Sequence, residues 1–398
     1  MAEKLWNVGE ANFVPEVRSQ MNLPRKVIVF DETLREGEET PGMNMSTDLK
    51  VEIARVLEEM GVREVNMGYM GYIEEHAAAA KAVKKACPKL ILTGYIRAHG
   101  TADIEKLLDV AKESGIDKVD INIPSSDYQF KIKGLSKGLI MDVTPEAIYK
   151  AKQYGFEVTY GPYDTTRTEL NYLKALLKIA EQAGASRVRV YDTLGVLNPA
   201  ATRWWVSELV KTISIPIQYH THDDFGMGTA NTCAAVEGGA SAIDLVVNGL
   251  GDRAGNTSFE ETVLALEALY NVDTGIDLSQ LIRLSKLVET AGIKVPRNKP
   301  VVGENCFIHE ADMHVQGILS GNWQTFEPYH PSVVGQARQV YFGSTTSRSS
   351  IDMLARSINV AISEAKIEDA LREVLQIVSD RVYATQQEVE DLIRKYAQ

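Results

Sequence analysis

The sequence predicts a (β/α)8 barrel, an α/β fold, followed by a smaller, mainly α-helical appendage. Eight short runs rich in valine and isoleucine alternate with longer segments of helical period between residues 26 and 275, a pattern typical of βαβ units with parallel strands. Eight units in one stretch fit a closed barrel better than an open doubly wound sheet, which seldom repeats so evenly. The predicted strands begin at Lys26, Arg63, Leu90, Lys118, Phe156, Arg187, Ile215 and Ala242.

The segments between these strands have the pattern of amphipathic helices. In the segment that starts at Thr47, the apolar residues Val51, Ala54 and Leu57 fall near one helical face. Each segment ends near a glycine, which is common at the C-terminal ends of helices. These segments are therefore predicted to be the helices that alternate with the strands.

The rhythm of strands and helices changes after about residue 275. One more helical segment is followed by a loop-rich stretch with four of the chain's 13 prolines, and amphipathic patterns return near the C-terminus. The predicted division is an N-terminal extension over 1–25, a barrel over 26–275, a linker subdomain over 276–345 and a helical subdomain over 346–398.

The composition argues against several classes of protein. A formal net charge of −12 disfavours nucleic acid as the main partner, since phosphate backbones are bound through clustered lysine and arginine. The three cysteines are far apart and form no C-x-x-C pair, so neither a disulfide framework nor a cysteine zinc site is indicated. The N-terminus lacks a signal pattern, and no window approaches about 18 uninterrupted apolar residues. We therefore expect a cytoplasmic protein without nucleic-acid or membrane partners.

Two histidines at the end of the seventh predicted strand are candidate metal ligands. His220 and His222 are two residues apart, so both imidazoles point to the same face of the strand. Glu36, just after the first strand, is the candidate third ligand, which leaves positions open for water or substrate. A histidine pair can also simply cap a strand with hydrogen bonds. Barrel enzymes build their sites at the C-terminal ends of strands, however, and this position favours a metal.

Other polar residues gather at the same predicted end of the barrel. Arg35 is a candidate for binding an alkoxide or a carboxylate, with an ion pair to Asp31 or Glu38 as the alternative. The glycine-rich loop Asn248–Asn256 precedes a predicted helix, so its backbone amides would either accept an anionic group or only form a tight turn. Three lysines are expected in a solvated loop after the fourth strand, with a phosphate contact as the alternative: Lys131, Lys133 and Lys137.

Three segments resemble the motifs of a known enzyme family. Asp31–Glu39 reads DETLREGEE where that family has D-x-T-L-R-D/E-G-E-Q, and His220–Asn231 reads HTHDDFGMGTAN where it has H-x-H-N/D-x-G-x-x-x-A-N. Asn248–Asn256 reads NGLGDRAGN, against N-G-I/L-G-E/D-R-A-G-N. The chain thus resembles the metal-dependent acyl-CoA condensing enzymes that include 2-isopropylmalate, homocitrate and citramalate synthases, over nearly its whole length.

The resemblance implies an acyltransferase that joins acetyl-CoA to a 2-oxo acid in a Claisen-type condensation and releases free CoA. The product would be a 2-hydroxy-2-substituted succinate, an alkylmalate of the kind made in amino-acid biosynthesis. The resemblance further implies a homodimer and a divalent ion on Glu36, His220 and His222, with Asn256 nearby. These ligand types do not distinguish Mg, Mn and Zn.

The resemblance also assigns roles to other residues. Arg35 would stabilise the alkoxide, and His314 would help to remove the methyl proton of acetyl-CoA. Thr193 would contact the substrate carboxylate. The other residues expected at the site are Tyr163 as a catalytic group, Arg97 and Arg167 for the substrate, and Gly249, Gly251 and Asn256 for the cofactor.

Four residues depart from the family pattern. Members usually have Gln in place of Glu39, Glu in place of both Asn66 and Tyr163, and Tyr in place of Phe326. The Glu at the position of Tyr163 belongs to the catalytic machinery of relatives, so this change puts the proton-transfer chain in question. Tyr163 itself and Tyr329 are the substitutes considered.

The same departures bear on the substrate. Two of them remove a carboxylate from the expected barrel mouth, and Arg97 resembles the arginine with which homocitrate synthases bind the far carboxylate of 2-oxoglutarate. Less negative charge lowers the cost of binding a dianion, so we expect a 2-oxo diacid rather than the branched acid of leucine synthesis.

Two alternatives to the condensing enzyme stay open. One is an acyl-CoA lyase of the hydroxymethylglutaryl-CoA lyase type, although the cysteine that those enzymes have in the loop after the eighth strand is absent here. The other is a barrel that has lost catalysis and only binds a metal or an acyl-CoA.

Overall fold

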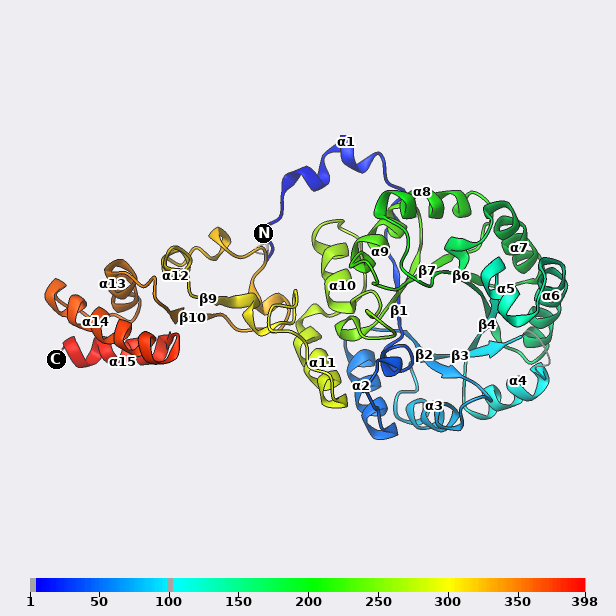
Figure 1. Cartoon of the computed structure of the whole chain (residues 1–398), viewed down its shortest axis with the longest axis horizontal. Coiled ribbons are helices and arrows are strands. Elements are labelled where there is room, and N and C mark those ends of the chain that lie inside the picture. The colour runs from blue at the N-terminus through cyan, green and yellow to red at the C-terminus, as the bar shows by residue number, and fades with distance from the viewer. Residues whose placement is uncertain (1–4, 99–102, 398) are drawn as a thin grey trace. The chain divides into compact units, whose positions relative to one another are not determined.

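Eight parallel strands close into a barrel in the computed structural model, which describes residues 5–98 and 103–397 (Figure 1). The strands pair in chain order, and β1 pairs with β8 to close the ring. The predicted fold class is confirmed. The barrel strands are β1 (Ile28–Asp31), β2 (Glu64–Tyr69), β3 (Ile91–Arg97), β4 (Lys118–Pro124), β5 (Glu157–Tyr163), β6 (Arg187–Asp192), β7 (Ile217–Thr221) and β8 (Ala242–Leu245).

Helices surround the ring of strands, as Figure 1 shows. Their apolar faces are buried as the sequence pattern predicts: Ala54 and Leu57 of α2 are fully buried. The helices of this part of the chain are α1 (Pro15–Arg18), α2 (Thr47–Glu59), α3 (Glu74–Ala86), α4 (Ile104–Glu113), α5 (Asp127–Lys133), α6 (Lys137–Gln153), α7 (Leu170–Ala183), α8 (Pro199–Val210), α9 (Gly228–Glu237), α10 (Phe259–Ala268) and α11 (Leu281–Val288).

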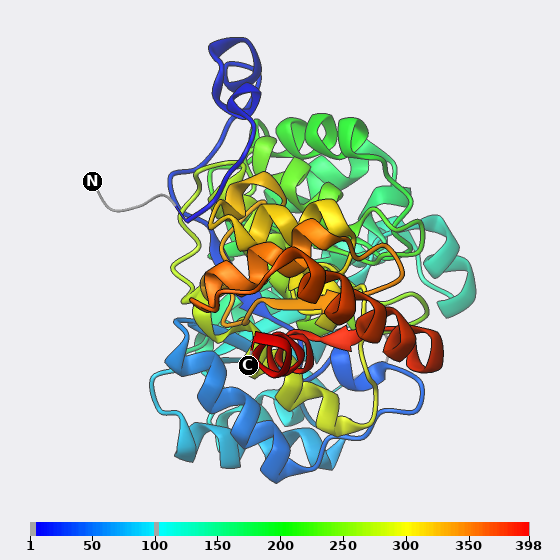
Figure 2. The same ribbon diagram turned by 90° about the vertical axis from the view of Figure 1, so that its left-hand side faces the viewer.

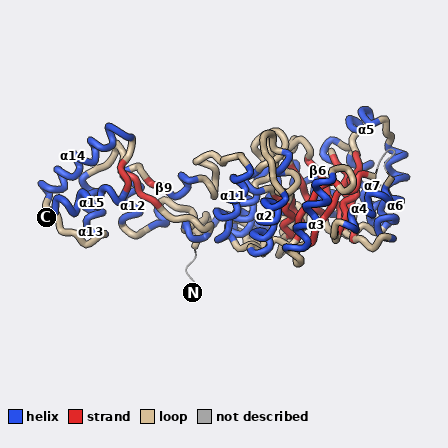
Figure 3. Tube along the Cα trace, turned by 90° about the horizontal axis from the view of Figure 1, so that it is seen from below, coloured by secondary structure: helices blue, strands red, loops and turns tan. Residues whose placement is uncertain are grey.

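The short helix α5 is an extra element between β4 and α6. The Ser126 hydroxyl caps it by accepting a hydrogen bond from the Gln129 N–H, and Gly134 ends it in the left-handed conformation at φ 66°. Lys131 and Lys133 therefore lie in a helix, and Lys137 opens the next one, so the prediction of a loop is wrong for these lysines. Figure 3 shows α5 beyond the other helices at one end of the barrel.

The chain divides into two compact units. Residues Glu10–Val295 form the barrel unit, and the residues up to Gly9 together with those from Pro296 form the second unit. The predicted subdomains at 276–345 and 346–398 stay predictions, and the first four residues of the predicted N-terminal extension lie outside the described residues.

The second unit packs helices around a small sheet in the strand order β11-β10-β9 (orange to red in Figure 2). Its apolar core includes Val340 and Phe342 of the sheet and Ile351 and Leu354 of a helix. No helix among the residues that the structure describes is long and apolar enough to cross a membrane. The elements are β9 (Ile308–His309), α12 (Asp312–Leu319), β10 (Gln339–Phe342), α13 (Arg348–Ser357), α14 (Glu364–Arg381), β11 (Ala384–Thr385) and α15 (Gln386–Ala397).

Candidate active site

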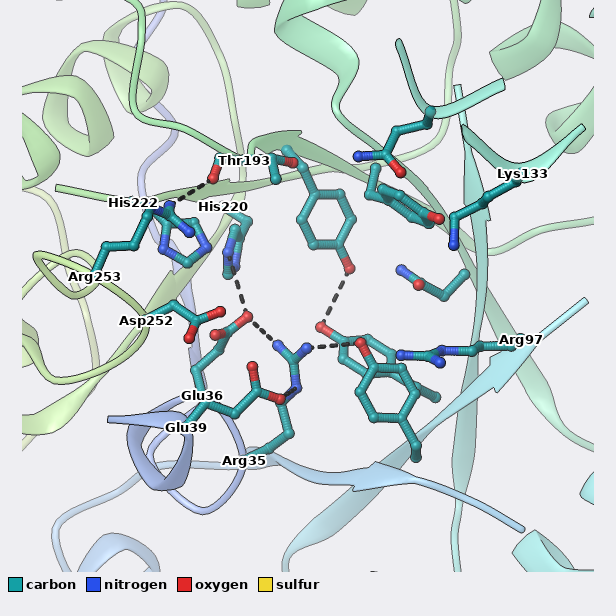
Figure 4. Close-up of a pocket in the computed structure, with 16 residues that line it drawn as sticks. Arg35, Glu36, Glu39, Arg97, Lys133, Thr193, His220, His222, Asp252 and Arg253 are labelled. Carbon is teal, nitrogen blue, oxygen red and sulfur yellow. Dashed lines mark hydrogen bonds and ion pairs between the residues drawn. The ribbon is translucent and has the colours of Figure 1, made fainter. Parts of the chain in front are cut away.

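A cavity of about 290 Å³ lies at the C-terminal ends of the barrel strands (Figure 4). This volume is at the small end of the range for small-molecule sites. Its wall comes from β2 to β7, from the segment after β1, from the loop after β8 and from α5. In Figure 4, Arg97 and Lys133 lie across the cavity from His222 and Arg253, so the cavity has two distinct ends.

One end, called here the histidine end, holds the three residues predicted as metal ligands: Glu36, His220 and His222. One ligand atom from each lies within 4.8 Å of the others, and all three side chains are buried. His220 Nε2 lies 3.7 Å from Glu36 Oε1. The structure thus brings together residues that are far apart in the chain, and their role as ligands stays a prediction.

The donors at the histidine end fit a divalent ion. Glu36 Oε2, His222 Nδ1 and Asn256 Oδ1 are buried and have no hydrogen-bond partner among the described residues. Leaving such atoms unpaired is costly, and carboxylate and imidazole donors suit several divalent metals. Burial lowers the pKa of His222 to about 4, so its imidazole is neutral and able to ligate. Burial acts to raise the pKa of Glu36, but Arg35 and the two histidines hold it at about 2.

His220 is oriented by a carboxylate on the neighbouring strand. Its Nδ1 lies 2.9 Å from Asp244 Oδ2 in β8, which leaves Nε2 directed toward the Glu36 side. Asp244 is fixed in turn by Gln218 Nε2, at 2.5 Å from Oδ1, and by Arg189 Nε, at 3.0 Å from Oδ2. A histidine ligand typically donates its second ring nitrogen to such a partner, which sets the tautomer.

A network of buried charges lies in the barrel interior below the cavity. Arg189 is fully buried and contacts three carboxylates, with Nη2 2.5 Å from Glu32 Oε1 and Nη1 3.1 Å from Asp120 Oδ2, besides Asp244. Burial raises the pKa of Asp120 to about 7, even though Arg189 acts to lower it. Glu32, His220 and Asp244 also lie close enough to hold an ion. Arg189 already contacts Glu32 and Asp244. Among the described residues, Glu32, His220 and Asp244 have no unpartnered buried side-chain atom, whereas Glu36 Oε2 and His222 Nδ1 have no partner. The Glu36 set is therefore the better metal candidate.

Arg35 connects the histidine end to the middle of the cavity. It is buried, hydrogen-bonds to Glu36, and donates from Nη2 to the Tyr69 hydroxyl at 2.8 Å. Its Nε lies 3.3 Å from Glu39 Oε1. The alternative ion pairs are not formed, because Glu38 pairs with Lys50 instead and Asp31 accepts hydrogen bonds from its neighbour Thr33. These contacts are Lys50 Nζ to Glu38 Oε2 at 2.6 Å and Thr33 N to Asp31 Oδ1 at 3.0 Å.

The glycine-rich loop after β8 forms a tight turn. The Gly249 N–H donates to the Val246 carbonyl at 3.0 Å, and the Gly251 N–H donates to Thr40 Oγ1 at 2.7 Å. Both amides already have partners within the protein, as the tight-turn alternative predicts, and the cofactor-binding role of Gly249 and Gly251 stays a prediction. The loop instead positions Asn256, which bridges to His222 in the backbone. A side chain at Gly251 would collide with the Asn256 amide, because an added Cβ would lie 2.0 Å from Nδ2.

Besides Arg35, three of the four other barrel residues expected to act on the substrate line the cavity. They are Arg97, Tyr163 and Thr193, whose hydroxyl accepts the Asp164 N–H at 2.9 Å. Arg167 does not line the cavity, since its guanidinium forms two hydrogen bonds with Asp164 at 2.8 and 2.7 Å. Its role in substrate binding stays a prediction.

The end of the cavity opposite the histidines is called here the far end and consists of Arg97, Lys133 and Tyr163. The Arg97 guanidinium stacks on Tyr69 at 4.2 Å from the ring centroid. Burial raises the pKa of the Tyr163 hydroxyl well above its usual value, although Arg97 acts to lower it. Tyr163 is therefore a neutral hydrogen-bond donor rather than a base at neutral pH.

His314 belongs to the second unit, where it lies in α12. Its ring stacks on Phe326 at 4.0 Å between centroids, with 21° between the planes. Phe326 stands where the family usually has tyrosine, so this contact offers no hydroxyl to the imidazole. The neighbouring His309 approaches Glu327, with 3.1 Å between Nε2 and Oε1. The catalytic role of His314 stays a prediction.

Several cavity residues were not found from the sequence. Three charged residues of the buried network below the cavity were also not found, and a charged residue within an apolar strand run is the signal that could have revealed Asp120, Arg189 and Asp244. The wall residues that were missed come singly from strand ends and α5, without a motif to mark them: Tyr69, Tyr95, Asn122, Gln129, Lys133 and Tyr191. Asp252 and Arg253 lie within the glycine-rich motif after β8, which was singled out without assigning a role to these two residues.

Comparison with known proteins decides the family. Residues 26–288 match the model of the family described as HMGL-like. The chain belongs to the HMGL-like family. Residues 301–382 of this HMGL-like chain match a second model, described as the homocitrate synthase post-HMGL domain-like family. The family resemblance of the motifs is thereby confirmed.

Relatives of this HMGL-like chain are named as synthases. It is 36% identical to a homocitrate synthase of Methanopyrus kandleri, over 97% of this chain and 96% of that protein. It is also 36% identical to a 2-isopropylmalate synthase of Methanocaldococcus jannaschii, over 92% of this chain and 70% of that protein. An (R)-citramalate synthase of the same organism is 35% identical, over 87% of this chain and 70% of that protein.

Solved structures agree in fold. The HMG-CoA lyase of Bacillus subtilis superposes with a TM-score of 0.61 at 19% identity, and the match covers 69% of this HMGL-like chain and 97% of the lyase chain. The carboxyl transferase domain of Rhizobium etli pyruvate carboxylase gives a TM-score of 0.57 at 20% identity, covering 70% of this chain and 51% of that one. At such identities the likeness extends to the barrel fold alone.

Proposed function

We propose that this chain is an acyltransferase that condenses acetyl-CoA with a 2-oxo acid and releases free CoA, with a divalent ion bound by Glu36, His220 and His222. Three relatives that are named as synthases of different acids (homocitrate, 2-isopropylmalate and citramalate), each about 35% identical, support this class of reaction. The observation that supports the site best is the set of buried, unpartnered donor atoms beside Arg35 in the barrel cavity.

Different residues of the chain are proposed to carry out different steps of this reaction. An ion held by these ligands would polarise the keto group and orient the 2-oxo acid. Arg35 lies beside Glu36 and is buried, so its guanidinium is positioned to stabilise negative charge that forms on the keto oxygen. Thr193 supplies a hydroxyl to the carboxylate of the 2-oxo acid, and His314 accepts the methyl proton of acetyl-CoA. A C–C bond forms to the keto carbon, and water then hydrolyses the thioester.

We propose that the 2-oxo acid carries a second carboxylate, which binds at the far end of the cavity. Arg97 lines the cavity there and has no carboxylate partner within residues 5–98 and 103–397. A dianionic 2-oxo acid supplies that partner. The same reasoning favours 2-oxoglutarate or oxaloacetate over the apolar 2-oxoisovalerate as substrate. A homodimer is proposed on the resemblance, and a cytoplasmic location on the scattered cysteines and the lack of a signal pattern in the sequence.

An assay of CoA thiol release tests the reaction. Purified protein is incubated with acetyl-CoA and, in turn, 2-oxoglutarate, oxaloacetate, pyruvate and 2-oxoisovalerate, with and without a chelator. We expect release only when both substrates and the divalent ion are present. A lyase would cleave a single acyl-CoA without any 2-oxo acid, and a barrel that only binds its ligands would release no thiol. Turnover of 2-oxoisovalerate far above both diacids would overturn the diacid proposal and leave the condensation intact.

A further inference from the structure

The charges that line the cavity are balanced at the histidine end and unbalanced at the far end. Four cationic side chains other than histidine line the cavity. Arg35 is paired with Glu36, and Arg253 is paired with Asp224, with 2.8 Å between Nε and Oδ1. Neither Arg97 nor Lys133 has an acidic partner in the described part of the chain. Both cations that lack a protein partner are therefore found at the end away from the metal ligands (Figure 4).

Lys133 reaches the cavity from a different element than Arg97. Arg97 is the last residue of β3, and its guanidinium is held over the Tyr69 and Tyr72 rings at 4.2 and 5.4 Å from their centroids. Lys133 is the last residue of α5, which also places Gln129 on the cavity wall. The helix α5 therefore forms part of the cavity wall at the strand ends. Lys133 lines the cavity, whereas Lys131 on the same helix does not.

We infer that Lys133 is a specificity-determining residue that binds, together with Arg97, the second anionic group of the 2-oxo acid. This inference rests on the proposed function and extends it to a residue that the sequence placed in a solvated loop. A fixed guanidinium supplies a planar pair of donors, and a flexible ammonium supplies a point charge that follows the anion. Because neither cation has a carboxylate partner in the described protein, the substrate anion completes the charge balance of the far end.

The proposed role of Lys133 can be distinguished from two other roles by which KM it affects. A lysine that is only solvated would not affect any substrate. A lysine that contacts the phosphates of acetyl-CoA would affect the KM for acetyl-CoA and not the KM for the 2-oxo acid. Figure 4 shows Lys133 on the same side of the cavity as Arg97, and Asn122, which pairs with Arg97 in the sheet, also lines the cavity. This position favours the 2-oxo acid, because Arg97 is the proposed partner of its far carboxylate.

The test compares 2-oxoglutarate with 2-oxoglutaramate, its neutral amide at the far carboxylate, in steady-state thiol release. For Lys133→Met we expect the KM for 2-oxoglutarate to rise by roughly five- to tenfold, the size of one ordinary net hydrogen bond. The KM for the amide, the KM for acetyl-CoA and kcat should stay within about twofold of wild type. Lys133→Arg should keep the KM for 2-oxoglutarate. Lys131→Met is the matched control on the same helix and should behave as wild type for every substrate.

Several results would overturn the role of Lys133. They are an equal loss with the diacid and the amide, no change in Lys133→Met, or a rise confined to the KM for acetyl-CoA. Failure of the proposed function looks different, since the wild-type protein would then release no thiol with any 2-oxo acid. In that case calorimetric binding of 2-oxoglutarate to wild type and Lys133→Met still decides the inference, which fails if both proteins bind it equally or neither binds it.

Discussion

The two ends of the barrel cavity are built in opposite ways. At the histidine end, Glu36, His220 and Asp244 are tied together by hydrogen bonds and ion pairs within the protein, and the donor atoms left over face one another. At the far end, Arg97 and Lys133 have no such partners among the described residues. The first arrangement is preorganised for an ion, and the second is completed only by a ligand. The proposals thus assign the reaction class to the histidine end and the choice of substrate to the far end.

The largest effect is expected from removing a ligand at the histidine end. His222→Ala should lower thiol release by at least about a thousandfold, because the ion that polarises the keto group is lost. Metal analysis after dialysis should find the variant depleted, and chelated wild-type protein should have the same residual rate. A variant that retains both its metal and its turnover would show that His222 is not a ligand.

Arg35 should matter nearly as much, although it binds no metal. Arg35→Lys keeps the charge but loses the planar fork that contacts Glu36, Tyr69 and Glu39, so kcat should fall by about a hundredfold to a thousandfold. Metal content should be unchanged. Arg253→Lys is the matched control at the cavity rim, and a comparable fall in that variant would contradict a specific role for Arg35.

A smaller effect is expected from changing Asp244, which contacts the predicted metal ligand His220. Asp244→Asn removes the charge that orients His220, which should weaken metal binding by about ten- to a hundredfold in a competition assay. Asp120→Asn is the control, because Asp120 also contacts Arg189 but does not contact His220. If both variants lose metal affinity equally, the effect comes from the buried network as a whole rather than from the orientation of the ligand.

The smallest effect concerns Tyr163 at the far end. Tyr163→Glu places a carboxylate beside Arg97, so the KM for 2-oxoglutarate should rise by about tenfold. Tyr163→Phe removes only a neutral donor. Because burial raises the Tyr163 pKa, the hydroxyl stays protonated below it, and the ratio of wild-type to Tyr163→Phe rates should be constant over roughly pH 6 to 9. A ratio that changes within this range would mean that the phenol ionises during turnover.

The fold and the histidine end could be predicted because their signals are local. The alternation of strands and helices is visible in the sequence itself. A barrel brings the ends of its strands together, so Glu36 could be predicted to share a metal site with the two histidines before any contact was known. Arg35 was found for the same reason. Its partners were not, since the choice of Glu36 and Glu39 over Asp31 and Glu38 depends on side-chain packing.

The far end could not be predicted in the same way. Lys133 reaches the cavity only because Ser126 starts a short helix after β4, and a seven-residue helix has too little period to be recognised. The buried charges of Arg189 and Glu32 were missed because they balance each other across strands that are distant in sequence. The closed amides of Gly249 and Gly251 likewise follow from contacts such as the one with Thr40, which no motif specifies.

A crystal structure of the protein with Mn²⁺ and 2-oxoglutarate tests both ends of the cavity in one measurement. The proposals predict an anomalous peak enclosed by Glu36, His220 and His222, with the keto acid end of the ligand on that side and its far carboxylate within hydrogen-bonding distance of Arg97. A peak among Glu32, His220 and Asp244, or a ligand bound with its keto acid end at Arg97, would contradict the account.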